Sequence, residues 1–393
     1  MNQREPINTV LFQVIQSEIC GKRLDETFFE DLSLETLEQL YRLTKFHDIT
    51  HIIASALNKH RILLRDEISQ KYKTQLMMSV YRYENINYEL KKISDIFENN
   101  RIAFLPLKGA VLRKLYPEPW MRTSCDIDIL IYPEDVKKAI SVLSEVGFVQ
   151  QKTTTTYDYQ LQSESGVHLE LHFSLKQDAS ILQAETVLEN VWNECELAAE
   201  SSFQYCMSNE MLIFYHIVHM ANHFTYGGCG IRPIIDLWLM INKIDIDYDK
   251  LRAMLLQSKL INFYEASVEL SKVWLENAPH NDITFGMEQF ILRGGVYGNE
   301  VTSAVMKAAK GEGKIKSFLK LLFLPRANLE VSYPNLRKYP VLLPFYQVKR
   351  WFRVFDRKKR KQIEEMIAAR NTVEKNDENQ AQSLLLHLGL YKQ

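Results

Sequence analysis

The sequence CDIDILIY at residues 125–132 predicts a buried strand that carries two carboxylates, because its apolar, mostly β-branched residues alternate with aspartates. Residues two apart in a strand point to the same face. Asp126 and Asp128 therefore share one face, while Ile127 and Ile129 point into the core. Two neighbouring carboxylates repel each other, and a divalent cation removes that repulsion. The stretch therefore predicts a cation site on one face of a sheet.

A second strand, VHLELH at residues 167–172, offers a third carboxylate. Its apolar residues alternate with His168, Glu170 and His172, which share one face. If this strand lies beside the first, Glu170 joins the aspartates. Three carboxylates on adjacent strands suit Mg²⁺, with Mn²⁺ as the alternative ion, and paired ions of this kind promote phosphoryl or nucleotidyl transfer. Taken alone, such a strand is also typical of a solvent-facing surface.

A lysine–glycine turn precedes both strands. The apolar run at residues 102–105 predicts a short strand that leads into Leu107-Lys108-Gly109, and a short helix follows over residues 110–115. Backbone N–H groups at such a helix start bind phosphate, and Lys108 adds a positive charge. The ordered combination of strand, turn, helix and two acidic strands favours a functional site over a chance pattern.

This order resembles the polymerase-β-like nucleotidyltransferase superfamily, and more closely its bacterial family of uncharacterised nucleotidyltransferases. The resemblance covers residues 100 to about 240. It rests on Leu107-Lys108-Gly109, Tyr116-Pro117, Arg122, Asp126-Ile127-Asp128-Ile129-Leu130, Gly147-Phe148 and Leu169-Glu170-Leu171-His172. Two departures concern the nucleotide: Ala110 stands where the superfamily usually has Ser or Gly, and the gap from Gly109 to Asp126 is somewhat long.

The resemblance implies an enzyme that moves a nucleoside monophosphate from an NTP, with ATP as a candidate, to a hydroxyl or phosphate of a small molecule or peptide. It implies that Asp126 and Asp128 hold the metal ions, and that Glu170 ligates one of them and takes the acceptor's proton. Lys108 and Arg122 then neutralise the phosphate charge.

Several residues outside this motif are further candidates. His172 shares a face with Glu170 and either orients that carboxylate or has a structural role. By resemblance, Arg232 and Asp236 face the cleft; the alternative is an ion pair between residues four apart on a helix. A predicted helix that begins after residue 208 carries three histidines on one face, which bind zinc, contact nucleotide or acceptor, or form a polar seam between helices: His216, His219 and His223.

Length and composition are those of a globular protein with more than one domain. Of 393 residues, 46% are hydrophobic and 25% are charged, and the net charge of -1 argues against a protein that binds polyanions over its whole surface. Five scattered cysteines with no Cys-x-x-Cys pair predict neither a zinc knuckle nor a disulfide framework. With no evident signal peptide and no apolar run of membrane-spanning length, we expect a cytoplasmic protein without a membrane span.

The expected fold is α+β: a small mixed-sheet nucleotidyltransferase domain inserted among mostly helical N- and C-terminal regions. A long helix is predicted from residue 65 to about residue 99. Prolines and aromatic residues at 321–347 predict an extended wrap, residues 350–370 a basic helix, and residues 371–382 a loose segment. The expected domains are an N-terminal helical region (1–99), the catalytic domain (100–178), a helical domain that closes the cleft (179–320), and the C-terminal wrap with its basic helix (321–393).

Two other functions compete with modification of a small molecule or peptide. The basic stretch near the C-terminus would suit a toxin-like enzyme that modifies tRNA or protein, although such a face is more often simply solvated. A catalytically inactive nucleotide-binding module is the third hypothesis. The clustered carboxylates argue against it, because clustered acids without a function cost stability.

Overall fold

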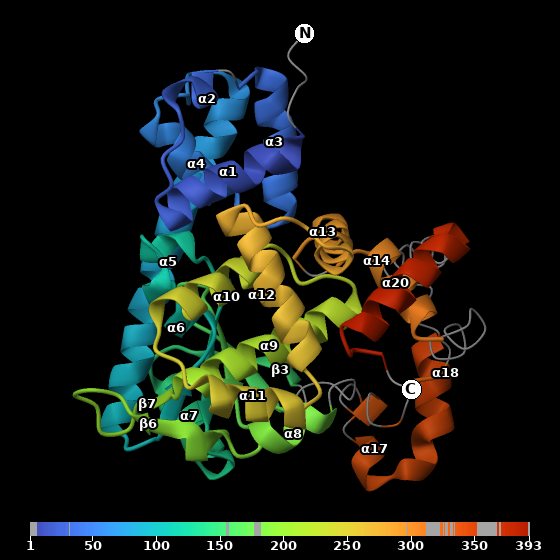
Figure 1. Ribbon diagram of the computed structural model, residues 1–393. Helices are drawn as coiled ribbons and strands as arrows, with labels where there is room; N and C mark the ends of the chain where they lie inside the picture. Colours follow the sequence, from blue (N-terminus) through green and yellow to red (C-terminus); the bar gives the residue numbers. More distant parts are fainter. Residues whose placement is uncertain are drawn as a thin grey trace.

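A computed structural model shows a mostly helical chain with one mixed five-stranded sheet and one two-stranded hairpin among the residues it describes (Figure 1). The predicted α+β fold is confirmed, because the sheet domain lies in the sequence between helical regions. None of the described helices is long and apolar enough to cross a membrane. The structure describes residues 6–30, 32–154, 157–176, 182–296, 298–311, 323–324, 326, 329–330, 333, 335–351, 368 and 371–391.

Helices precede the sheet, and the longest of them was expected from its apolar stripe. Side chains cap two of these helices: Ser33 accepts the N–H of Thr36, and Asp66 accepts that of Ser69. The predicted long helix is confirmed and ends at Asn99, as its sequence indicated. The helices are α1 (Ile7–Cys20), α2 (Glu26–Glu30), α3 (Leu34–Phe46), α4 (Thr50–Lys59) and α5 (Glu67–Asn99).

The sheet brings the two acidic strands side by side. Its strands, in spatial order, are β1 (Phe104–Pro106), β2 (Asp126–Ile131), β5 (His168–His172), β4 (Asp158–Gln162) and β3 (Val149–Thr154). β2 and β5 are parallel, and the other neighbours are antiparallel. Ile127, Ile129, Leu169 and Leu171 pack with α5 and α7 (Val136–Glu145) in one buried cluster. Since side chains alternate along a strand, the carboxylates lie on the opposite face.

The helices that follow the sheet in the sequence, α8 to α14, form a helical half. It covers that opposite face and shares a core with the first helices. Phe12 of α1 stacks on Trp274 with ring centroids 4.6 Å apart, and Gln16 Nε2 donates to the Trp274 carbonyl at 2.8 Å. One hydrophobic cluster therefore joins helices from both ends of the chain. The helices of this half are α8 (Leu182–Leu188), α9 (Asn209–Tyr226), α10 (Arg232–Lys243), α11 (Tyr248–Gln257), α12 (Ile261–Glu276), α13 (Asp282–Gly294) and α14 (Glu300–Ala309).

The helical pattern expected from residue 180 onward is interrupted by a hairpin of β6 (Cys195–Leu197) and β7 (Tyr205–Met207). Strands of three residues are too short to show a period of two, so the sequence pattern did not reveal them. A hydrogen bond joins the hairpin to β1: the Phe104 N–H donates to the Phe203 carbonyl at 2.9 Å. It extends the edge of the sheet at β1.

The C-terminal expectations need two corrections. Within 321–347, the described residues form α17 (Asn335–Lys338), the 3-10 turn Pro340–Leu342 and α18 (Leu343–Trp351) rather than an extended wrap. Proline is tolerated in the first turn of a helix, where its missing N–H costs nothing. Of the expected basic helix at 350–370, most lies outside the described residues.

The segment expected to be loose, 371–382, contributes instead to a regular helix, α20 (Lys375–His387). Only Ala381 and Leu385 of this helix are buried, together with the following Leu388. Because so few of its residues are buried, the composition of this segment is polar. The three buried apolar side chains nevertheless hold the helix against the rest of the protein. In Figure 1, α20 lies beside α14, and the two helices are in contact.

Candidate active site

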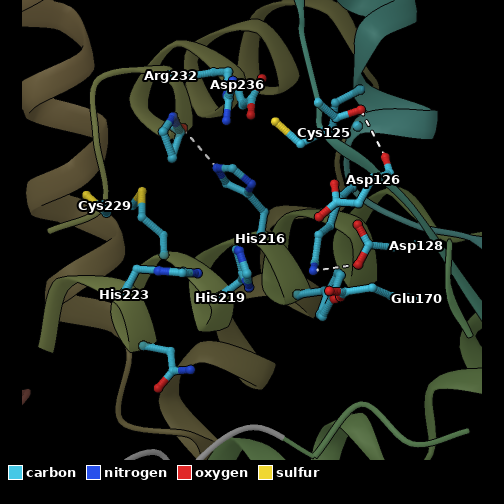
Figure 2. A pocket seen from close by; sticks show the side chains of 18 of the residues that line it. Cys125, Asp126, Asp128, Glu170, His216, His219, His223, Cys229, Arg232 and Asp236 are labelled. Atoms are coloured by element: carbon cyan, nitrogen blue, oxygen red, sulfur yellow. Dashed lines mark hydrogen bonds and ion pairs between the residues drawn. The ribbon is translucent and has the colours of Figure 1, made fainter. Parts of the chain in front are cut away.

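A cavity of 460 Å³ lies between the acidic face of the sheet and the helices α9 and α10. Figure 2 shows Asp126, Asp128 and Glu170 on one side of it and His219 and His223 on the other. All the residues that the sequence singled out line this cavity: Lys108, Gly109, Arg122, Asp126, Asp128, Glu170, His172, His216, His219, His223, Arg232 and Asp236. The structure thus gathers them at one place, and their individual contacts distinguish what each can do.

The parallel pairing of β2 and β5 brings Asp128 beside Glu170. The register sets Asp128 opposite Glu170, and Asp126 opposite His168. Ligand atoms of Asp128, Glu170 and His172 lie within 4.8 Å of one another, close enough to hold a metal ion. This group contains two of the three expected carboxylates, and His172 stands in it where Asp126 was expected. In the described part of the chain this is the only such group of metal-ligating side chains.

Asp128 is the centre of the charge network. Its Oδ1 accepts Lys108 Nζ at 2.8 Å and His172 Nε2 at 3.0 Å, and His172 Nε2 also lies 3.6 Å from Glu170 Oε2. Burial opposes the charge of Asp128, but Lys108 and His172 outweigh it and hold the pKa of Asp128 well below its usual range. Burial likewise opposes the charge of His172, but Asp128 and Glu170 raise the pKa of His172 to about 9. His172 is therefore a cation at neutral pH.

Asp126 is in the opposite situation, because no cation among the described residues forms an ion pair with it. Burial and then the charge of Asp128 raise its pKa from 3.8 to about 6. A carboxyl whose pKa is higher in the folded protein destabilises the fold when it ionises. This cost is complete above about pH 6 and fades as the pH falls toward 4.

We predict that Asp126→Asn raises the stability of the ligand-free protein by about 1 kcal/mol at pH 8, after allowance for solvent screening. The gain should shrink at pH 4, because the wild-type carboxyl is then protonated in the folded chain and no longer places a charge there. Urea unfolding at the two pH values checks this. A gain of equal size at both would show that the charge of Asp126 is not its source.

The turn before α6 (Gly109–Leu112) places Lys108 against the carboxylates rather than leaving it open for phosphate. The N–H of Ala110 donates to the Leu107 carbonyl at 3.1 Å and closes a tight turn. Gly109 fits closely here: a Cβ added to it would lie 3.1 Å from Ser124 Cβ. Burial opposes the positive charge of Lys108, but Asp128 raises the pKa of Lys108 above its usual range. Lys108 is thus a permanent cation beside Asp128.

Arg122 and Asp236 form a buried ion pair that links the sheet domain to α10. Arg122 Nε donates to both carboxylate oxygens of Asp236 at 2.9 Å, and the Tyr116 hydroxyl donates to Asp236 Oδ1 at 2.7 Å. The alternative of an ion pair between Arg232 and Asp236 is therefore wrong. Arg232 instead contacts Asp48 Oδ2 at 3.3 Å, because the turn before α4 brings that carboxylate to α10. Arg122 was expected to be available to phosphate, but in the structure it is already paired with Asp236.

Removing the charge of Asp236 should destabilise the protein strongly. Asp236→Asn leaves the buried Arg122 guanidinium without a counter-charge, a change that costs about 3–5 kcal/mol. Asp245→Asn, an exposed aspartate beyond the end of the same helix, is the control and should change stability by less than about 0.5 kcal/mol. Urea unfolding measures both, and equal losses would mean that the pair does not hold α10 to the sheet domain.

The three histidines of α9 do not form a zinc site in the described part of the chain. His216 Nε2 is hydrogen-bonded to the Pro233 carbonyl of α10 at 2.8 Å, as expected of a polar seam between helices. The rings of His219 and His223 meet edge to face, 4.4 Å between centroids. Burial lowers the pKa of His223 to about 4, and burial followed by the charge of Lys108 lowers the pKa of His219 well below its usual range. Both rings are therefore neutral walls of the cavity.

Sequence reasoning missed several residues of the cavity. Asp158 and Gln160 come from β4, whose register sets Gln160 opposite Glu170. Because β4 pairs with β5 in this register, residues 158 and 160 share a face with 170 and 172. Tyr215 of α9 had no signal in the sequence: it lies within an apolar run, and its place beside the cavity depends on how the helix docks. Burial raises the pKa of Tyr215 to about 12, so its hydroxyl is a donor.

Comparison with known proteins bears on this cavity directly. The family model described as "Uncharacterised nucleotidyltransferase" matches residues 34–276, which include every residue of the network described above. No curated protein matches the chain. Among solved structures, the solution structure of the antibiotic-resistance factor ANT(2'')-Ia is 15% identical with a TM-score of 0.32, over 45% of this chain and 91% of that one.

Proposed function

The chain belongs to the family of uncharacterised nucleotidyltransferases, and we propose that its cavity moves a nucleoside monophosphate from an NTP to a hydroxyl or phosphate of a small molecule or peptide. The observation that carries this proposal is the parallel pairing of β2 and β5, which sets Asp128 beside Glu170 with Asp126 on the same face. Clustered carboxylates under a helical cover are costly to the protein alone, and cations with a triphosphate would remove that cost.

The donor set fits a hard divalent cation, for which we propose Mg²⁺, with Mn²⁺ as a substitute. Asp126, Asp128 and Glu170 offer the carboxylate oxygens that Mg²⁺ prefers. The pKa of Asp126, which burial and the charge of Asp128 raise to about 6, reflects the repulsion that such a cation would relieve. The chemistry supplied by a bound cation is neutralisation of charge on the triphosphate and on the departing pyrophosphate.

In the proposed reaction, Glu170 takes the proton of the acceptor's hydroxyl group. The Glu170 side chain is 29% exposed and faces the cavity, so an acceptor can reach it. The acceptor oxygen bonds to the α-phosphorus as the α–β phosphoanhydride bond breaks, and pyrophosphate leaves. His172 is charged and contacts both carboxylates, and it would hold Asp128 and Glu170 in position.

We assign the helical wall to the nucleotide base or the acceptor. His219 and His223 present neutral rings there, and Arg232 adds a positive charge at the same wall. Arg122 and Asp236 act by positioning, because their pair fixes α10 against the sheet domain. Gly109 keeps the turn close to the strand that carries the aspartates.

The test is incubation of the protein with each α-³²P-labelled NTP, Mg²⁺, and separate small-molecule, peptide and RNA fractions of a cell extract. We expect label in the small-molecule or peptide fraction, with pyrophosphate released in equal amount and no label without a divalent cation. Label only in RNA would favour the toxin-like function instead. Nucleotide binding without transfer to any fraction would contradict the proposed activity.

A further inference from the structure

Two positively charged side chains already contact Asp128, the carboxylate on which the proposed function places a metal ion. Lys108 Nζ and His172 Nε2 share one oxygen, Asp128 Oδ1, at 2.8 and 3.0 Å. The Asp128 side chain is only 4% exposed, so these two contacts dominate its surroundings. A divalent cation that approached Asp128 would meet an ammonium group at bonding distance from the same carboxylate.

The backbone shows that this placement of Lys108 is built into the turn. Lys108 has a φ of 47°, in the left-handed region that only glycine adopts without strain. The turn is fastened on both sides of this residue: the Leu107 N–H donates to the Asp128 carbonyl at 2.9 Å, and the Ala110 N–H to the Leu107 carbonyl at 3.1 Å. A lysine is thus held in a conformation that favours glycine, with its ammonium group against Asp128.

We propose that Lys108 holds the place of a divalent cation on Asp128 and moves to the triphosphate when cation and nucleotide bind together. The inference rests on the proposed function and adds that the cation binds well only with nucleotide. A triphosphate supplies the negative charge that would draw the ammonium away from Asp128. The lysine side chain is suited to this, because it is a flexible point charge with three donors and the cavity lies beside it.

A divalent cation on Asp128 would be repelled by Lys108, the nearer of the two cations that already contact this carboxylate, and the repulsion is strong in a partly desolvated site. Lys108 therefore weakens binding of a bare divalent cation. It does not weaken binding of a cation–nucleotide complex, because the phosphates then neutralise it. The consequence is selectivity for the complex over the free ion.

The experiment is a titration with Mn²⁺, followed by the electron paramagnetic resonance of the free ion, with and without the non-hydrolysable analogue α,β-methylene ATP. The proteins compared are wild type, Lys108→Met and Lys114→Met. Methionine keeps most of the length of the stem and the strained backbone, and it removes the ammonium group with its charge. Lys114 is an exposed lysine of the neighbouring 3-10 turn, so its variant controls for the change in net charge.

We expect wild type and Lys114→Met to bind Mn²⁺ weakly alone and at least about tenfold more tightly with the analogue, a difference of about 1.4 kcal/mol. Lys108→Met should bind Mn²⁺ alone at least about tenfold more tightly than wild type, and the analogue should add little. Lys108→Gly removes the charge and also relieves the strained φ, so it keeps the test valid if the methionine variant folds poorly.

Mn²⁺ affinity in both Lys108 variants no higher than in wild type, with the analogue still enhancing wild-type binding, would overturn the role of Lys108 and leave the proposed function standing. Absence of Mn²⁺ binding in every protein, even with the analogue, would overturn both.

Discussion

Asp128→Asn should reduce nucleotidyl transfer by about 10²–10³-fold, the range for loss of one preorganised electrostatic contact. Asp128 lies opposite Glu170 and is the carboxylate to which both neighbouring cations, Lys108 and His172, are bonded. Asparagine keeps the shape of the side chain and removes its charge, so Lys108 and His172 lose their counter-ion. The labelled-NTP assay measures the loss of transfer.

The same variant should lose the thermal stabilisation that Mg²⁺ and an NTP together give to the wild type. Glu134→Gln is the control, because Glu134 is an exposed carboxylate just beyond the end of β2 and does not line the cavity. It should keep both the transfer and the thermal shift. An unchanged thermal shift in Asp128→Asn would rule out Asp128 as a ligand of the cation.

Stability without ligand should also separate the two aspartates. The pKa of Asp128 is depressed in the folded protein, so its charge stabilises the fold above about pH 4, and that stability is lost as the pH falls. Asp128→Asn should therefore be less stable than wild type at pH 8, whereas Asp126→Asn should be more stable. Two aspartates on one face of one strand thus respond with opposite sign to the same substitution.

Glu170→Gln should separate chemistry from binding. Glutamine keeps the size of the side chain and much of its hydrogen bonding, but it neither accepts the acceptor's proton nor ligates a cation as a carboxylate does. We expect nucleotide affinity within a few-fold of wild type and transfer slower by at least about 10², the scale of one general base. Calorimetric titration of the nucleotide analogue and the labelled-NTP assay measure the two quantities separately.

Glu164→Gln is the matched control for this change. Glu164 lies in the exposed turn that joins β4 to β5, six residues before Glu170 in the sequence. The control should transfer label at the wild-type rate. Wild-type transfer in Glu170→Gln as well would exclude Glu170 from both of its proposed roles.

The sequence predicted those parts of the site that depend on local periodicity. The alternation of polar and apolar residues predicted that Asp126 and Asp128 share one face of β2 and that Glu170 lies on the polar face of β5. The structure pairs these two strands. The long helix α5 was equally visible, because an apolar stripe over many turns has few alternatives.

What depends on contacts between distant segments was not predictable. Arg122 and Asp236 are 114 residues apart, and no local pattern indicates that they pair. Asp236 has an arginine four residues before it, which made the local ion pair the natural but incorrect alternative. The direction of Lys108 follows from one unusual φ, and residue type alone would have assigned glycine to that conformation.

The contact between α1 and α12 has a consequence for how the protein is made. Phe12 and Gln16 find their partner at Trp274, and 258 residues separate Gln16 from it. At about 5–20 residues per second, a ribosome needs roughly 13–50 s to add that length. For this time the side of α1 that packs on α12 stays without its partner, whereas α3 and α4, which also contact α1, are already made. The N-terminal helices therefore complete their packing only when synthesis has passed the whole five-stranded sheet.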